Sequence, residues 1–323
     1  MHPDAKAWFR RNTSSANDWS RADVTRAKAG RTVSVIIPAR DEAETVGAIV
    51  ESIVHNLMDG DAPLVDELLV VDSDSQDDTA AVAQACGARV LATSAILPLI
   101  PPVAGKGEAM WRGLAATDGD FVVFVDADLR SFTPEYVVAL LGPLMTDTDI
   151  RLVKAAYARP LVNDSGVRIG GGGRVTELVA RPLLNLHWPE LAGVAQPLAG
   201  EYAARRDTLE DVPFPCGYGV EIALLIDIAA RWGINTIAQV DLGERLHRHQ
   251  DQQRLGLMAA EIWQVALARL DPQGLLPRSG ETLAQFTYGP QGLEVADHHV
   301  DVLARPPMRD IRSATAATAA THR

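Results

Sequence analysis

Short apolar runs alternate with amphipathic stretches from residue 33 to residue 126, and this alternation constrains the fold more than any other feature of the sequence. The runs are VSVIIP, ELLVVD, ARVLA and DFVVFVD. The stretches between them, residues 43–57, 77–86 and 106–116, have apolar positions at helical spacing. Continuous apolar runs of this length indicate strands buried on both faces, as in a parallel sheet. We therefore predict an α/β fold with a Rossmann-like, mostly parallel sheet flanked by helices.

The rhythm loosens after residue 157, where the sequence reads NDSGVRIGGGGR. Further on, the spacing predicts helices at 175–186, 219–231 and 255–270 and a strand at 235–240. The apolar positions of the last helix fit either core packing or a dimer contact. We predict four regions: an N-terminal arm (1–30), an α/β region (31–157), a second region with a looser pattern (158–307), and a flexible tail (308–323).

The net charge and the cysteine content exclude several classes of function. The net charge of −12 opposes the long-range attraction that nucleic-acid binders and binders of anionic membranes use. Cys86 and Cys216 lack a metal-ligand spacing and are too few for a disulfide framework, which suits a reducing compartment. We see neither a targeting signal nor an apolar run long enough to span a bilayer. We therefore expect a cytoplasmic protein with no nucleic-acid partner and no membrane segment.

Two carboxylates, Asp126 and Asp128, follow directly on the apolar run FVVFV. Carboxylates placed side by side at the mouth of a buried strand repel each other unless a cation lies between them. Mg²⁺ binds in this way, through one or two carboxylates together with phosphate oxygens of a substrate. The pair therefore predicts a metal and diphosphate site, although strand-ending aspartates also cap helices.

The other strand ends carry polar groups as well. Ligands of open α/β sheets bind beyond the carboxyl ends of the strands, which here are marked by VIIPARDE and VVDSDSQDDT. These segments can hold a nucleoside. The second segment also reads as a helix cap, with Ser75 or Asp77 before the helix.

Three later motifs supply cations and donors. GKGEAMWRG lacks the glycine and the hydroxyl residue of a Walker loop. Lys106 can balance diphosphate charge, and a solvated lysine at a helix start is an equal alternative. GGGGRVTELVARP offers free backbone N–H groups with Arg174 and Thr176, and with Arg245 it predicts a phosphate-recognising acceptor site. Glu221 opens an apolar helix, where the helix dipole favours a carboxylate even without a function.

Taken together, these motifs resemble a known family. VSVIIPARDEAETVG, GKGEAMWRGLAAT, GDFVVFVDADL, QPLAGEYAARR and PFPCGYGVEIALLID resemble the glucosyl-3-phosphoglycerate synthases, retaining GT-A glycosyltransferases of actinobacteria. The resemblance covers about residues 27 to 275. It implies that residues 31–157 form the nucleotide-sugar (donor) binding region and residues 158–307 the acceptor-binding and dimerisation region. It implies transfer of glucose from UDP-glucose to the 2-hydroxyl of D-3-phosphoglycerate with Mg²⁺, Mn²⁺ or Co²⁺. It also implies a homodimer and a role in making glucosylglycerate or methylglucose lipopolysaccharide.

The same resemblance implies site residues, position by position. The donor-binding set is Pro38, Ala39, Arg40, Glu42, Ser73, Lys106, Asp126 and Ala127. The metal ligands are Asp128 and His247, and the catalytic set is Glu221, Asp126 and Lys106. The acceptor-binding set is Gly172, Gly173, Arg174, Thr176, Tyr218, Arg245 and His249.

Several positions depart from the family pattern. Arg40 and Asp74 change the charge beside the donor, and His249 replaces an asparagine of the acceptor site. A mannosyl-3-phosphoglycerate synthase that uses GDP-mannose therefore stays an alternative.

Two non-synthase alternatives remain. One is a sensor that binds a nucleotide sugar without catalysis. The other is a phosphatase with an aspartyl nucleophile, which is disfavoured because Gly-Thr does not follow Asp128.

The expected mechanism is charge stabilisation of the departing UDP by the metal and Lys106. No motif announces a carboxylate nucleophile. We therefore favour attack on the same face as the leaving group, with Glu221 orienting sugar hydroxyls.

Overall fold

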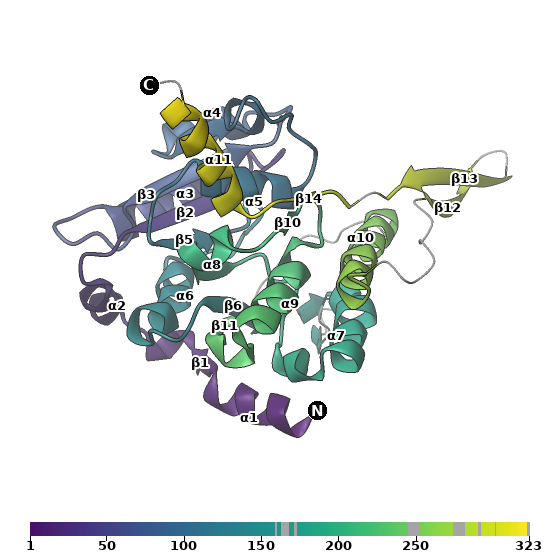
Figure 1. Cartoon of the computed structure of the whole chain (residues 1–323), viewed down its shortest axis with the longest axis horizontal. Coiled ribbons are helices and arrows are strands. Elements are labelled where there is room, and N and C mark those ends of the chain that lie inside the picture. The colour runs from purple at the N-terminus through teal and green to yellow at the C-terminus, as the bar shows by residue number, and fades with distance from the viewer. Residues whose placement is uncertain are drawn as a thin grey trace.

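The centre of the molecule is an eight-stranded sheet with the order β1-β11-β6-β9-β5-β2-β3-β4 (Figure 1). The computed structural model describes residues 1–158, 160–162, 168–170, 173–244, 252–273, 282–289, 292–300 and 302–321. Every neighbouring pair in this sheet is parallel except the two pairs that β9 makes with β5 and β6. The prediction of a mostly parallel sheet is confirmed.

The first half of the sheet contains the four strands that the apolar runs predict. They are β2 (Val33–Ala39), β3 (Glu67–Asp72), β4 (Arg89–Ala92) and β5 (Phe121–Phe124). The intervening helices are α3 (Val46–Ile53), α4 (Thr79–Ala85) and α5 (Lys106–Ala115). The first helix starts at Val46 rather than at residue 43, because the N–H groups of Thr45 and Val46 both bond to the carbonyl of Glu42 and form a turn. A π-helical turn, η2 (Val54–Met58), extends it.

The second half of the sheet is only partly predicted by the sequence. It contains β6 (Leu152–Ala158), β9 (Tyr202–Arg205) and β11 (Ile237–Glu244), of which only β11 was expected, at 235–240. Helix α6 (Glu135–Thr146) between β5 and β6 was also not predicted. The pattern of β6 is broken by Lys154, and β9 is only four residues long and contains two alanines, which have weak strand propensity.

Residues 1–30 form helix, strand and helix. They are α1 (Pro3–Arg11), β1 (Thr13–Ser15) and α2 (Arg21–Lys28). Strand β1 pairs with β11 and so forms one edge of the sheet. The Trp8 indole N–H donates to the carbonyls of Ile234 and Ile237 at 3.0 Å, which fastens α1 beside the start of β11. The segment for which we expected an arm thus pairs with the sheet.

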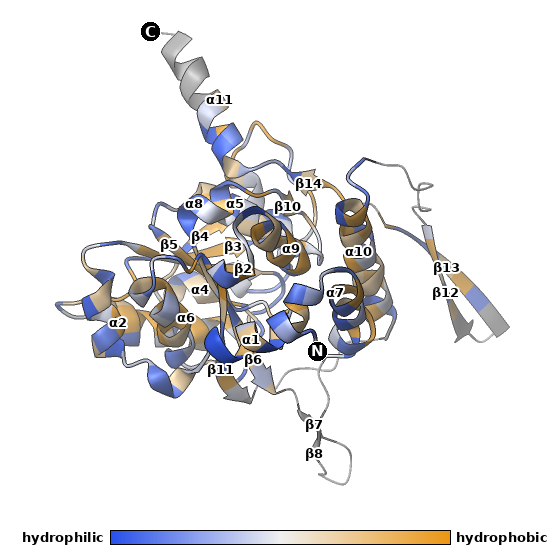
Figure 2. Cartoon of the chain, turned by 60° about the horizontal axis from the view of Figure 1, so that its bottom comes forward, coloured by the Kyte–Doolittle hydropathy of each residue, from blue (hydrophilic) through white to orange (hydrophobic). Residues whose placement is uncertain are grey.

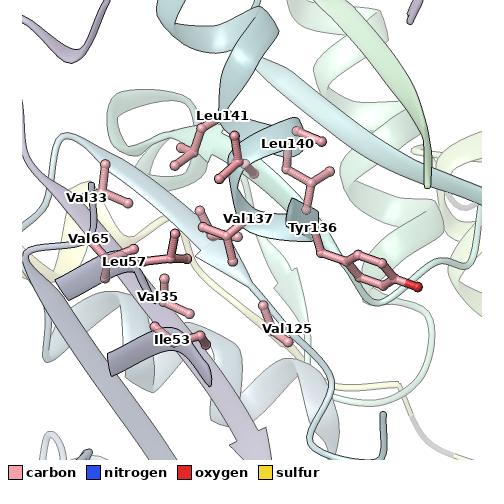
Figure 3. Packing of buried hydrophobic residues seen from close by; sticks show 14 of the residues in the cluster. Val33, Val35, Ile53, Leu57, Val65, Val125, Tyr136, Val137, Leu140 and Leu141 are labelled. Atoms are coloured by element: carbon pink, nitrogen blue, oxygen red, sulfur yellow. The ribbon is translucent and has the colours of Figure 1, made fainter. Parts of the chain in front are cut away.

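Two apolar clusters cover the two faces of the sheet. Alternate residues of β2 point to opposite clusters, since Val33, Val35 and Ile37 belong to one and Ile36 to the other. Figure 3 shows the first cluster, in which Val35 and Val125 meet α3 and α6 side chains such as Ile53 and Val137. The second cluster joins the sheet to α5 and α9 (Val220–Trp232). The apolar run of β5 is buried at all four positions, as its sequence predicts.

The later part of the chain packs on the second face and extends from it. It contains β7 (Pro160–Val162), β8 (Arg168–Gly170), the π-helical turn η4 (Thr176–Ala180), α7 (Arg181–His187), α8 (Arg206–Glu210) and α10 (Gln252–Leu270). The hairpin of β12 (Thr282–Gly289) and β13 (Gly292–His299) projects away from the body (Figures 1 and 2).

The chain then returns to the body after the hairpin. Strand β14 (Ala304–Arg305) pairs with β10 (Phe214–Pro215). Whereas we expected a flexible tail from residue 308, helix α11 spans Met308–Thr321, and the Met308 side chain is buried. In the described part of the chain no helix is both long enough and apolar enough to cross a membrane.

Candidate active site

Three neighbouring strands end at the same edge of the sheet and bring the predicted donor residues together. Strand β2 lies between β3 and β5, and all three are parallel. Ala39 is in register with Asp72, and the Ser73 N–H donates to the Ala39 carbonyl at 2.9 Å. Pro38, Ala39 and Ser73 therefore lie at one edge, at the point where ligands of open α/β sheets bind.

The loop after β2 is fixed by side chains of the loop after β3. Asp41 has a left-handed backbone with φ of 56°, and its carboxylate accepts from the Gln76 N–H at 2.7 Å. The Ser75 hydroxyl accepts from the Asp41 N–H, and the Asp77 carboxylate accepts from the N–H groups of Ala43 and Thr79. Asp77 therefore caps the first residue of α4, as one of the two predictions had it, whereas Ser75 bonds to the loop after β2 and not to the helix. Arg40 is exposed beside this loop.

One ammonium joins two carboxylates of the site. Lys106 Nζ lies 2.6 Å from an Asp126 carboxylate oxygen and 2.8 Å from a Glu221 carboxylate oxygen. Burial alone would lower the pKa of Lys106, but the two carboxylates outweigh this effect and raise its pKa well above the ordinary value. Lys106 therefore stays charged at neutral pH. The structure brings together the three residues that we predicted as catalytic.

The glycines around Lys106 have a structural reason. Gly105 has φ of 136°, and a methyl group on Gly105 or Gly107 would meet the backbone of Cys216 or Pro215 at 2.3 Å or less. The Glu108 N–H donates to the Cys216 carbonyl at 3.0 Å. The start of α5 thus lies directly against the segment that leads to Glu221. This close approach, rather than a phosphate cradle, accounts for the sequence GKG.

Asp126 rests against a glycine that the sequence did not single out. A methyl group on Gly200 would lie 2.2 Å from each Asp126 carboxylate oxygen. On the other side of the turn, the Thr45 hydroxyl donates to the Ala127 carbonyl at 2.7 Å. Neither Gly200 nor Thr45 carries a pattern that sequence reasoning could have found, because each acts through its fit to a neighbour far away in the chain.

Asp128 lies half-buried two residues beyond Asp126. The predicted second metal ligand, His247, lies outside the described residues. Among the residues that are described, no group of three His, Cys, Asp or Glu side chains could hold a metal by itself. A carboxylate, an imidazole and diphosphate oxygens form a donor set that suits a divalent cation.

The predicted acceptor residues are only partly described. Gly173 and Arg174 lead into η4, with Arg174 exposed and Thr176 buried at 1% exposure. Tyr218 is 44% exposed, and its N–H donates to a Glu261 carboxylate oxygen on α10 at 2.7 Å. Gly172, Arg245 and His249 lie outside the described residues.

A buried charge network behind Lys106 was not predicted. Glu108 accepts from Arg112 at 2.6 Å and from Arg305 at 2.6 Å, and both Glu108 and Arg112 are fully buried. The Arg112 guanidinium also donates to the Thr93 and Ile100 carbonyls, which fixes the segment between β4 and α5. Burial would raise the pKa of Glu108, but Arg305 and Arg112 more than offset it and lower the pKa below its ordinary value.

A hollow of about 620 Å³ lies elsewhere, at the amino ends of β6 and β11. Asn12, Arg151 and Thr236 are among its lining residues, and none of the predicted site residues is. Because ligands of such sheets bind at the carboxyl ends of the strands, we place the active site at the Lys106 cluster.

Comparison with known proteins identifies the family. Residues 34–167 match the model of glycosyl transferase family 2. The chain is 49% identical to the glucosyl-3-phosphoglycerate synthase of Mycolicibacterium paratuberculosis over 94% of this chain and 92% of that protein. The chain belongs to the glucosyl-3-phosphoglycerate synthase family. A synthase of this family from Petrotoga mobilis is 47% identical over 77% of this chain and 76% of its own.

Solved structures show the same relationship. The chain is similar to glucosyl-3-phosphoglycerate synthase from Mycobacterium tuberculosis in complex with Mn²⁺, UDP-glucose and phosphoglyceric acid, with a TM-score of 0.83, 45% identity, and coverage of 93% and 98%. It is also similar to mannosyl-3-phosphoglycerate synthase from Rubrobacter xylanophilus, with a TM-score of 0.86, 38% identity, and coverage of 95% and 99%. The sheet with its flanking helices is therefore a GT-A fold, and the chain is a glycosyltransferase.

Proposed function

We propose that this enzyme transfers glucose from UDP-glucose to the 2-hydroxyl of D-3-phosphoglycerate, giving glucosyl-3-phosphoglycerate and UDP. The observation that carries the proposal is the Lys106 ammonium, held by Asp126 and Glu221 at the carboxyl ends of the central strands. The relative from M. tuberculosis is described with UDP-glucose and phosphoglyceric acid together, which supports the same donor and acceptor here.

In this proposal the uridine lies across the ends of β2 and β3. Pro38, Ala39, Arg40, Glu42 and Ser73 contact the nucleoside, and Ala127 lies beside it. The rigid bonds between the loops after β2 and β3 support this role, because they preorganise the loop without using the ligand. Donor binding then requires little loop ordering.

Lys106 has a second role when the donor is bound. A departing diphosphate develops negative charge, and a buried ammonium next to it stabilises that charge more than water would. Lys106 keeps its proton because Asp126 and Glu221 raise its pKa. It therefore acts as a fixed positive charge and not as a proton donor.

A divalent cation completes the proposed site. Asp128 and His247 would hold it, and when bound it neutralises charge on the UDP diphosphate. Relatives from M. tuberculosis are described with Mn²⁺ and with Mg²⁺, each together with UDP. The carboxylate of Asp128 suits either ion.

Retention of the anomeric configuration is part of the proposal. The Glu221 carboxylate, the obvious nucleophile candidate, is bound to Lys106 at 2.8 Å and is 5% exposed. A carboxylate held in this way is better suited to orient sugar hydroxyls than to attack. The acceptor oxygen then attacks from the face of the leaving group, its proton passes to a diphosphate oxygen, and the bond from the anomeric carbon to UDP breaks.

Phosphoglycerate binds next to the sugar in this proposal. Gly172, Gly173, Arg174 and Thr176 would face its phosphate, together with Arg245, while Tyr218 and His249 lie near the glycerate. Backbone N–H groups at the start of a helix and a guanidinium are typical phosphate donors.

We also propose that the enzyme is a cytoplasmic homodimer in glucosylglycerate or methylglucose lipopolysaccharide synthesis. Exposed apolar side chains support the dimer: Trp263 on α10 is 49% exposed, Phe286 on β12 is 63% exposed and Val295 on β13 is 60% exposed. Exposed large apolar residues of this kind often mark contacts between proteins. The molar mass by light scattering tests this assignment.

The product tests the proposed function. The enzyme is incubated with UDP-glucose labelled at the anomeric carbon, D-3-phosphoglycerate and Mg²⁺, and the product is identified by mass spectrometry and NMR. We expect one hexose on the 2-hydroxyl with the anomeric configuration of the donor. An inverted anomeric centre would refute same-face attack, and the absence of any hexosylated product would refute the proposed function.

The same assay is run in parallel with GDP-mannose as the donor. The TM-score with the mannosyl synthase is slightly higher than with the glucosyl synthase, and Arg40 and Asp74 depart from the pattern of the glucosyl enzymes. Faster transfer from GDP-mannose would leave the fold and the acceptor unchanged and would reassign the donor.

A further inference from the structure

Lys154 is a fully buried lysine in the middle of the sheet. It lies on β6 in register with Tyr202 of β9, and it is 1% exposed. Its ammonium donates to the Ala199 carbonyl and lies 4.4 Å from the centroid of the Tyr202 ring. Its strand neighbours Val153 and Ala155 are small and apolar, so a charged side chain at this position is exceptional.

The ammonium of Lys154 is costly to the fold. Burial lowers its pKa to about 8, although the nearby carboxylates Glu221, Glu201 and Asp126 act in the opposite direction. A buried base with a lowered pKa destabilises the folded state wherever it carries its proton. Packing alone therefore does not explain this lysine, since an apolar side chain of the same length would fill the space without that cost.

A short chain of contacts leads from Lys154 to the reacting groups. The Ala199 carbonyl, which accepts from Lys154, belongs to the peptide group that joins Ala199 to Gly200. Gly200 lies so close to Asp126 that a methyl group on it would be 2.2 Å from both carboxylate oxygens. Asp126 in turn bonds to Lys106. Lys154 thus fixes the wall against which the Asp126 carboxylate rests.

The charges of the cluster point the same way. Three carboxylates, Asp126, Glu201 and Glu221, and two ammonium groups, Lys106 and Lys154, interact within it. Without Lys154 the cluster would be more negative by one unit and would repel the diphosphate of a nucleotide sugar more strongly.

We propose that Lys154 is a positioning residue for the nucleotide-sugar donor, which it serves by holding Ala199 and Gly200 against Asp126 and by balancing the carboxylates behind Lys106. The inference rests on the proposed function, because the donor is the ligand that Asp126 and Lys106 serve. We expect its effect to fall on the donor, because its contact with Ala199 leads through Gly200 to Asp126 and Lys106.

The test compares Lys154→Met with a matched control, Lys28→Met. Lys28 is also buried, at 7% exposure, and it donates to the Pro63 carbonyl at 3.0 Å and pairs with Asp66 at 2.7 Å, far from the active site in the sequence and in the fold. Both substitutions remove one buried ammonium. They differ in whether that ammonium faces the active site.

We expect Lys154→Met to raise the KM for UDP-glucose about tenfold to a hundredfold while the KM for phosphoglycerate stays within about twofold, because Asp126 is no longer fixed. Its Tm should stay within a few degrees of the parent, since loss of a costly buried charge offsets loss of a hydrogen bond. Lys28→Met should instead lower the Tm and leave both KM values unchanged. A lowered Tm with unchanged KM values in Lys154→Met would overturn the proposal, and so would equal effects on both substrates.

A second variant keeps the test decisive if Lys154→Met does not fold. In Lys154→Gln the amide can still donate to the Ala199 carbonyl, but the charge is lost, so donor binding should still weaken. An unchanged KM for UDP-glucose in this variant would overturn the proposal.

Calorimetric titration of the protein with UDP in the presence of Mn²⁺ tests the role of Lys154 separately from the proposed glucosyl transfer. If the parent protein transfers no glucose, the proposed function fails. The Lys154 proposal then stands or falls on whether Lys154→Met weakens UDP binding while Lys28→Met does not.

Discussion

Gly200→Ala isolates the fit between Asp126 and its neighbour. The added methyl group would lie 2.2 Å from both Asp126 carboxylate oxygens, whereas ordinary contact begins at 3.4 Å. The carboxylate must therefore move by about 1 Å, which would break its 2.6 Å bond to Lys106. Gly200 has no positive φ, so the substitution adds no backbone strain. Misplacement of a reacting group by this amount costs about a hundredfold in rate.

The assay measures kcat/KM for UDP-glucose at saturating phosphoglycerate, with Gly142→Ala as the control. A methyl group on Gly142 of α6 would also lie 2.2 Å from a neighbour, the ring of Trp19, but this contact lies outside the active site. We expect Gly200→Ala to lose about a hundredfold in kcat/KM and Gly142→Ala to lose stability with near-normal kinetics. Activity of Gly200→Ala within threefold of the parent, or an equal kinetic loss in Gly142→Ala, would refute the reasoning.

Three further predictions address the charges around this site. Glu108→Gln should lower the free energy of unfolding by about 3–5 kcal/mol, because it leaves Arg112 and Arg305 buried without their counter-charge. A denaturant titration measures this loss, and a loss below about 1 kcal/mol would contradict the prediction. The kcat/KM of the parent for UDP-glucose should fall as the pH rises through about 8, where Lys154 loses its proton. Lys154→Met should lack this decline. The titratable groups that face Lys154 are Lys106, Asp126, Glu201, Tyr202 and Glu221. For stability the sign is opposite, since the unfolded chain binds more protons between about pH 8 and 10.5, so the contribution of Lys154 to stability should rise with pH in that range. Glu221→Gln should lose about tenfold or more in kcat without accumulating a glycosylated protein by intact-mass spectrometry, and a trapped adduct would show double displacement instead.

The first half of the fold was predictable because its physics is local. Strands β2, β3 and β5 are continuous apolar runs, and helices α3 to α5 carry apolar positions at helical spacing. Strands β6 and β9 were missed because Lys154 interrupts one and the other is four residues of mostly alanine and tyrosine. Their strand character comes from pairing with each other and with neighbours far apart in the chain, which a single sequence does not display.

The candidate site likewise contains residues that the sequence predicts and residues that it does not. Lys106, Asp126 and Glu221 stand at strand ends and helix starts, so the topology that the pattern predicts brings them together. Gly200 and Lys154 act through contacts of the segment that leads into β9, and no periodicity marks them. The described structure adds this supporting layer to the residues that the motifs indicate.

Release of UDP is the most direct test of the central claim that this protein is a metal-dependent synthase of glucosyl-3-phosphoglycerate. UDP is measured with UDP-glucose alone, with D-3-phosphoglycerate added, and with both substrates in Mg²⁺ or in chelator. We predict rapid release only when the donor, the acceptor and the metal are all present. Release that is independent of phosphoglycerate, or no release with all three present, would contradict the account.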